Sequence, residues 1–196
     1  MAYAGQTITN PITHEEITFV RTTAETDGQS LVFDCRVTPG GATLPVHIHD
    51  TQEERFEVIY GQLGVRLGNK KQVLHRGDKI ILPARIKHQW WVPGDQPVLF
   101  RVEVLPARNL ERVLEVISAM AHAGKMNSRS MPKNPFELAN IGRLSENYLP
   151  FLPISLQKVM LAMGSRMGAL LGVDPQLAGY QASPAPTREV VAETVA

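Results

Sequence analysis

The stretch that decides the fold is residues 41–54, which read GATLPVHIHDTQEE. His47 and His49 lie two positions apart in a region of strand character, and side chains with this spacing share one face of a strand. Glu54 opens the next run, in which apolar and polar residues alternate, and its carboxylate belongs to the apolar-facing series. Two imidazoles and a carboxylate are therefore expected to point towards the interior.

This inward-facing polar set predicts a metal site. Burying a carboxylate and two imidazoles among apolar side chains costs free energy unless a partner neutralises them, and a divalent cation does so directly. On the His-x-His pattern alone, two surface histidines at a strand edge are the stronger interpretation. The choice between the two depends on the rest of the sequence.

The segment 15–104 has the pattern of an antiparallel sheet, because short alternating runs are separated by Gly, Pro, Asn and Asp. Asp27-Gly28 lies between the first two runs and suits a tight hairpin, since both positions tolerate positive φ. So many short strands at this spacing predict a sandwich or a small barrel. The expected strands are residues 15–22, 30–37, 55–60, 62–67, 72–75, 79–82, 88–92 and 97–105.

After Pro106 the apolar period changes from two to about 3.6, which predicts helices. Asn109 and Gly124 are placed to cap the first helix, and the sequence NPFE at 134–137 is a capping pattern for the second. The expected helices are residues 110–123, 135–148 and 155–171. The expected organisation is a barrel at 1–105, a helical extension at 106–174 packed on the barrel or on a dimer partner, and a mobile tail at 175–196.

Composition excludes several classes of protein. Hydrophobic residues make up 43% and charged residues 20%, as in soluble globular chains, and a net charge of +1 gives no field to attract nucleic acid. The one cysteine, Cys35, excludes an internal disulfide, and the start MAYAGQTITN lacks a secretory signal, so we expect a cytoplasmic protein. Lys158 and Arg166 interrupt the longest apolar stretch, which argues against a transmembrane helix.

Residues 41–61 resemble the first signature motif of the cupin superfamily. That motif consists of a glycine, five residues, His-x-His, four residues, a glutamate, six residues and a glycine. Every position is filled by a matching residue here: Gly41, His47, His49, Glu54 and Gly61. The resemblance covers residues 30–105 and implies a double-stranded β-helix, which is a jelly-roll barrel with a metal ion inside.

A second segment resembles the other cupin motif: glycine, five residues, proline, one residue, glycine, two residues, histidine, three residues, asparagine. The matching residues are Gly77, Pro83 and His88, whereas Arg85 replaces the second glycine and Val92 the asparagine. Because glycine is often used where φ is positive, Arg85 implies a different turn or local strain before His88. The family's metal ligands map onto His47, His49, Glu54 and His88.

Such a ligand set implies one divalent transition metal per chain. Three imidazoles and a carboxylate suit Fe2+, Mn2+, Ni2+, Co2+ or Zn2+ without selecting among them. Four protein ligands on an octahedral ion leave two positions for water, substrate or dioxygen, which favours catalysis. We expect an enzyme acting on a small organic molecule, with oxygenase chemistry ahead of isomerase, cyclase or lyase chemistry. The alternative, in which the protein is not an enzyme, is a non-catalytic ligand-sensing or binding cupin.

Several further residues are candidates for the site and its partners. Glu53 and Tyr60 are weak catalytic candidates, for which solvation and a structural role are the stronger interpretations. The methionines and the Gly-xxx-Gly spacing of residues 155–171 favour packing on the barrel or on a second subunit over association with a membrane surface, and we expect a homodimer. The side chains expected to line the substrate pocket are Phe56, Val58, Trp90 and Phe100.

Overall fold

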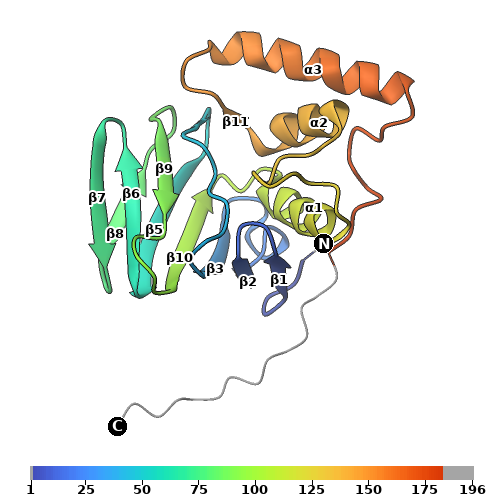
Figure 1. Cartoon of the computed structure of the whole chain (residues 1–196). Coiled ribbons are helices and arrows are strands. Elements are labelled where there is room, and N and C mark those ends of the chain that lie inside the picture. The colour runs from blue at the N-terminus through green and yellow to red at the C-terminus, as the bar shows by residue number, and fades with distance from the viewer. Residues whose placement is uncertain (1, 183–196) are drawn as a thin grey trace.

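The structure is a computed structural model that describes residues 2–182, and in it a strand-rich part is followed by three helices (Figure 1). The strands of the first part are β1 (Thr7–Asn10), β2 (Glu15–Arg21), β3 (Leu31–Val37), β4 (Ile48–His49), β5 (Glu53–Tyr60), β6 (Gln62–Leu67), β7 (Lys70–His75), β8 (Lys79–Leu82), β9 (His88–Trp91) and β10 (Val98–Leu105). The later elements are α1 (Leu110–His122), α2 (Pro135–Ser145), β11 (Asn147–Tyr148) and α3 (Ile154–Leu170).

The strands form a jelly-roll barrel. One sheet has the order β1-β2-β3-β10-β5-β8, a second has the order β7-β6-β9, and β11 pairs with β4. Side chains that alternate inward from the sheets make one apolar cluster, in which the rings of Phe56 and Phe100 lie 5.4 Å apart. The predicted fold, a mainly β double-stranded β-helix followed by three helices, is confirmed.

All the predicted strands are present, but the prediction of a tight hairpin between the first two is wrong. β2 and β3 do pair antiparallel. They are joined by a longer loop that contains a short 3-10 helix at Ala24–Thr26. Asp27 and Gly28 have φ values of 51° and 75°, so the positive φ expected of both residues is found within this loop. The sequence pattern missed β1, although its four residues alternate in burial. It also missed β4 and β11, whose two residues each are too few to show alternation.

The second helix ends earlier than predicted. Its start is as expected, since the Asn134 side chain accepts a 2.9 Å hydrogen bond from the Phe136 amide. It stops at Ser145 and not at Tyr148, because Glu146 adopts the left-handed conformation with φ 53°. The residues that follow form β11 and pair with β4, opposite Ile48 and His49. The helical extension thus adds a strand to the strand that carries one of the candidate ligands.

The helices have an apolar cluster of their own and also contact the barrel. The Ser118 hydroxyl of α1 donates a 2.8 Å hydrogen bond to the Thr9 carbonyl of β1. Leu177 is buried in the helical cluster, and its carbonyl accepts a hydrogen bond from Arg112. Within residues 2–182, no helix is long and apolar enough to cross a membrane. Of the tail predicted to be mobile, residues 175–182 include this packed leucine, and residues 183–196 lie outside the described part.

Candidate metal centre

Backbone pairing brings two of the candidate ligands together from distant parts of the chain. The His47 amide donates to the His88 carbonyl at 3.0 Å, and the His88 amide donates to the His47 carbonyl at 2.9 Å. Because residues paired in this way project side chains to the same face of a sheet, the two rings lie only 4.5 Å apart between centroids. The third histidine, His49, shares this face, and its ring centroid lies 5.0 Å from that of His47.

The donor atoms of the three histidines converge on one point. One ring nitrogen from each of His47, His49 and His88 lies within 4.8 Å of the others. Glu54 approaches from β5, with its Oε1 3.3 Å from His49 Nε2 and its Oε2 3.5 Å from His88 Nε2. Ligand atoms held about 2.1 Å from one ion lie at most about 4.2 Å apart. The cluster is therefore close to the dimensions of a single coordination sphere.

Two of the rings are fixed in the tautomer that metal binding requires. His47 Nδ1 lies 2.9 Å from the Pro45 carbonyl oxygen, and His88 Nδ1 lies 2.9 Å from the Ile86 carbonyl oxygen. A carbonyl only accepts hydrogen bonds, so each Nδ1 must carry the proton. Each Nε2 is then left with a lone pair directed into the cluster.

Burial and mutual proximity set the protonation states in the cluster. Burial lowers the pKa of His47 to about 4, with His88 and His49 adding to the effect. Burial also lowers the pKa of His88. For Glu54, burial acts to raise the pKa, but the neighbouring imidazoles, led by His49, lower it to about 2. At neutral pH these groups are thus two neutral imidazoles and a carboxylate, which are the forms that bind cations.

Three ring nitrogens of the cluster lack hydrogen-bond partners among the described residues. Both ring nitrogens of His49 and the Nε2 of His88 are buried without a hydrogen bond, although a carboxylate oxygen lies near. Buried polar atoms without partners are rare and costly in folded proteins. A divalent ion in the cluster would take one ring nitrogen of His49 and the Nε2 of His88, so the residues present fit such a group.

The turn before His88 contains the residue that departs from the cupin motif. Arg85 has φ 65°, the left-handed conformation that glycine adopts without cost. Its amide donates a 2.8 Å hydrogen bond to the carbonyl of His49, and its guanidinium lies 2.9 Å from the Asp50 carboxylate. The strained backbone conformation expected of Arg85 is therefore present. The hydrogen bond to His49 and the ion pair with Asp50 offset its cost.

Substituting Arg85 separates the backbone strain from the ion pair. Arg85→Ala keeps the left-handed residue and loses the pair, and we expect it to lower the free energy of unfolding by about 1 kcal/mol. Arg85→Gly loses the same pair but relieves about 1 kcal/mol of strain, and is expected to be close to wild type. Urea unfolding followed by circular dichroism measures both. Equal stability of the two variants would contradict the assignment of strain to this turn.

The other predicted site residues are distributed over the barrel. Phe56, Val58 and Phe100 are almost wholly buried in the barrel core. Trp90 is partly buried and packs edge-on against Phe100, with 5.3 Å between ring centroids. These four side chains line the interior of the barrel, but Glu53 and Tyr60 are not directed there. The Glu53 carboxylate accepts a 2.8 Å hydrogen bond from Arg55, and Tyr60 is 56% exposed at the end of β5.

Sequence reasoning missed a polar link between the cluster and the helical extension. Asp50 follows His49 directly, is 9% exposed and lies 2.5 Å from Lys158 of α3 in addition to its contact with Arg85. A cavity of about 420 Å³ is lined by these three residues together with Ile48 and the first turn of α3. The only sequence signal was an acid next to a candidate ligand and an isolated lysine in an apolar helix.

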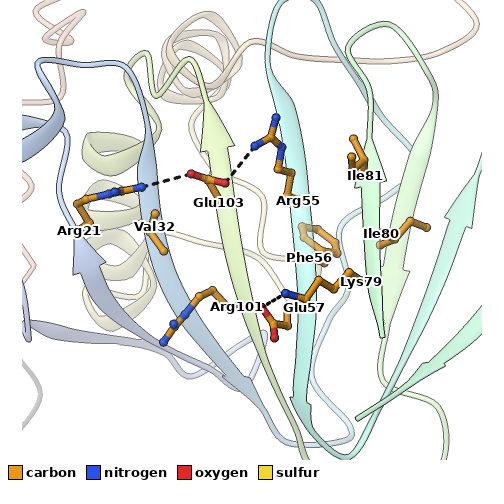
Figure 2. A pocket seen from close by; sticks show the side chains of 10 residues that line it. All are labelled: Arg21, Val32, Arg55, Phe56, Glu57, Lys79, Ile80, Ile81, Arg101 and Glu103. Carbon is orange, nitrogen blue, oxygen red and sulfur yellow. Dashed lines mark hydrogen bonds and ion pairs between the residues drawn. The ribbon is translucent and has the colours of Figure 1, made fainter. Parts of the chain in front are cut away.

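A larger surface hollow, of about 480 Å³, lies on the six-stranded sheet (Figure 2). Its charged side chains pair across the strands: Glu103 lies 3.3 Å from Arg21 and 3.4 Å from Arg55, and Lys79 lies 3.1 Å from Glu57. By the alternation along β5, Arg55 and Glu57 point to the opposite face from Glu54. This hollow is therefore the solvated outer face of the sheet and is separate from the histidine cluster.

Comparison with known proteins agrees with the barrel and the motifs. Residues 33–105 match the cupin domain family. The chain therefore carries a cupin domain at these residues. No curated protein matches the chain.

Many solved structures resemble the chain, and three illustrate the range. The cupin domain of Cnp3 from Schizosaccharomyces pombe is 13% identical with a TM-score of 0.41, and the match covers 46% of this chain and 60% of that one. KdgF from Halomonas is 19% identical with a TM-score of 0.43, covering 50% and 85%. An RmlC-like cupin from Shewanella frigidimarina is 18% identical with a TM-score of 0.46, covering 55% and 91%.

Proposed function

We propose that this protein is a metal-dependent cupin enzyme that acts on a small organic molecule, with one divalent transition metal held by His47, His49, Glu54 and His88. The observation that carries the proposal is the convergence of unpaired imidazole nitrogens and an ionised carboxylate in a buried site. Such a nitrogen and oxygen donor set lacks the thiolates of structural zinc sites and suits Fe2+, Mn2+, Ni2+, Co2+ or Zn2+.

Each side chain of the cluster has a distinct part in this proposal. The Pro45 and Ile86 carbonyls keep a proton on Nδ1 of His47 and His88, so the opposite nitrogens stay free as ligands. Glu54 supplies the negative charge that partly neutralises a divalent cation. When bound, the metal would supply Lewis acidity or, for a redox-active ion, reactivity with dioxygen. Trp90, which is partly buried and packs edge-on against Phe100, offers an apolar surface to the organic part of a substrate.

Within this class we propose oxygenase chemistry, because a redox-active ion held by the four candidate ligands would supply reactivity towards dioxygen. The test is oxygen consumption by protein loaded separately with Fe2+, Mn2+, Ni2+, Co2+ or Zn2+, in the presence of candidate phenols and enols. We expect uptake with a redox-active metal only, and none with Zn2+. Turnover that is independent of oxygen would favour isomerase, cyclase or lyase chemistry at the same residues. A site inert with every metal would contradict an enzyme and favour a ligand-binding cupin.

A further inference from the structure

Helix α3 uses one side to pack against α2. A Cβ atom placed on Gly164 would come within 2.9 Å of the Ala139 side chain, and one on Gly168 within 2.7 Å of the Phe136 side chain. The absence of these Cβ atoms lets the two helices approach closely. The Gly-xxx-Gly spacing of α3 is therefore accounted for within one chain, and a partner must use a different face of this helix.

A second face of α3 is apolar and open among the described residues. Figure 1 shows α3 at the outer edge of the helical part, with α2 on one side of it. The exposed side chains of this face recur at steps of four, three, four and three residues, which is the period of a coiled-coil seam. They are Leu156, Met160, Met163, Met167 and Leu170, with exposed fractions of 47%, 57%, 63%, 56% and 88%. We call these five side chains the α3 seam.

We propose that the α3 seam is a dimer interface whose occupant is the same seam of a second copy of this chain, packed antiparallel about a two-fold axis at Met163. A two-fold interface must be self-complementary. From Met163 outward the seam reads methionine and then leucine in both directions. In an antiparallel pair, Met160 of one copy therefore lies against Met167 of the other. Leu156 of one copy likewise lies against Leu170 of the other.

The charges on the helix favour a second protein helix over a lipid surface. Helix α3 has no acidic residue and only two cations, Lys158 and Arg166. Lys158 is paired with Asp50 of its own chain. Arg166 has no ion pair within residues 2–182. A single such cation on a narrow apolar stripe is a weak basis for membrane binding, which depends on a wide apolar face and several basic residues. A narrow seam with a period of 3.5 is the pattern that another helix fills.

The size of the seam is sufficient for a reversible dimer. Burial of a Leu- or Met-sized side chain removes on the order of 100 Å² from water. The five seam residues with the exposed Val159 and Leu171 beside them would then bury on the order of 1,400 Å² over two copies, within the range of specific interfaces. Flexible methionines limit the affinity, so we expect dissociation in the micromolar range.

The test is sedimentation equilibrium of the full chain between about 1 and 100 µM, which brackets the expected range. We expect a reversible monomer–dimer equilibrium. Met163→Glu places two carboxylates together at the two-fold axis and is expected to weaken the dimer at least tenfold. The matched control is Ala169→Glu, which adds the same charge to the same helix at an exposed position outside the seam, and it should leave the equilibrium unchanged.

The antiparallel arrangement has its own test. Met163→Cys should form an intermolecular disulfide under mild oxidation, because the two residues meet at the axis. Ala169→Cys should not, and the native Cys35 is buried. A chain that stays monomeric over the whole range overturns the proposal. So does a dimer that Met163→Glu leaves intact, or a monomer whose seam instead binds liposomes. These readouts need no metal, so their failure is distinct from failure of the proposed activity.

Discussion

Replacing His47 and His49 together by alanine is expected to abolish stoichiometric binding of a divalent transition metal. The double variant removes two of the three imidazoles whose nitrogens lie within 4.8 Å of one another, and leaves Glu54 and His88 as a two-ligand remnant. The residual site should bind at least a hundredfold more weakly, since each lost ligand removes a direct metal bond. Elemental analysis of protein purified without a histidine tag, followed by titration with Co2+ or Mn2+, measures the loss.

The fold should survive this substitution. His47 is held in the barrel by backbone hydrogen bonds to His88, which alanine retains. Far-ultraviolet circular dichroism should thus match the wild type. The matched control is His75→Ala, since His75 lies exposed on β7 and its loss should leave one metal per chain. Retention of a full equivalent of metal by the double variant would overturn the ligand assignment.

The strand pattern was sufficient to predict a sandwich or small barrel, because each of the eight predicted strands has its own local signal, whereas the jelly-roll topology came from the resemblance to the cupin motifs. Alternation along β5, for example, separates Glu54, Phe56 and Val58 from Arg55 and Glu57, and the structure has the same division. Part of the histidine cluster could also be predicted from the sequence, since His47 and His49 are two residues apart and therefore share one face of a strand. The convergence of His88 depended on the resemblance to the cupin motifs, because no local rule relates residues so far apart in the chain.

The connection between the extension and the cluster could not be predicted in the same way. The β4–β11 pairing involves two residues in each strand, too few for any periodicity. The second helix has a capping signal at its start, but its end depends on Glu146 adopting a positive φ, for which glutamate has no preference. Arg85 shows the converse. Its departure from the motif was visible in the sequence, but the contact with Asp50 that opposes its strain was not.

Removing the Asp50 carboxylate is expected to weaken metal binding, because Asp50 connects the helical extension to the candidate ligands. Its carboxylate joins Lys158 of α3 to Arg85, whose amide donates to the His49 carbonyl. The hydrogen bond from Lys158, aided by Arg85, holds the pKa of Asp50 below its usual range, so the pairs are ionic at neutral pH. Asp50→Ala breaks both pairs, and we expect metal affinity to fall about tenfold, at the lower end of the cost of altering groups that orient ligands.

Two further variants apportion this effect. Lys158→Met keeps the aliphatic part of the side chain and breaks only the ion pair between Asp50 and α3. If this variant loses as much metal affinity as Asp50→Ala, the helical extension is what orders His49. Asp34→Ala removes an acid that is also paired with an arginine, on the outer face of the sheet, and should leave metal affinity unchanged. If Asp50→Ala also binds metal as tightly as wild type, β4 is ordered by its backbone pairing with β11 and the ion pairs are dispensable. The ratio of the losses of metal affinity in Lys158→Met and Asp50→Ala therefore measures how much of the ordering of His49 comes from the helical extension.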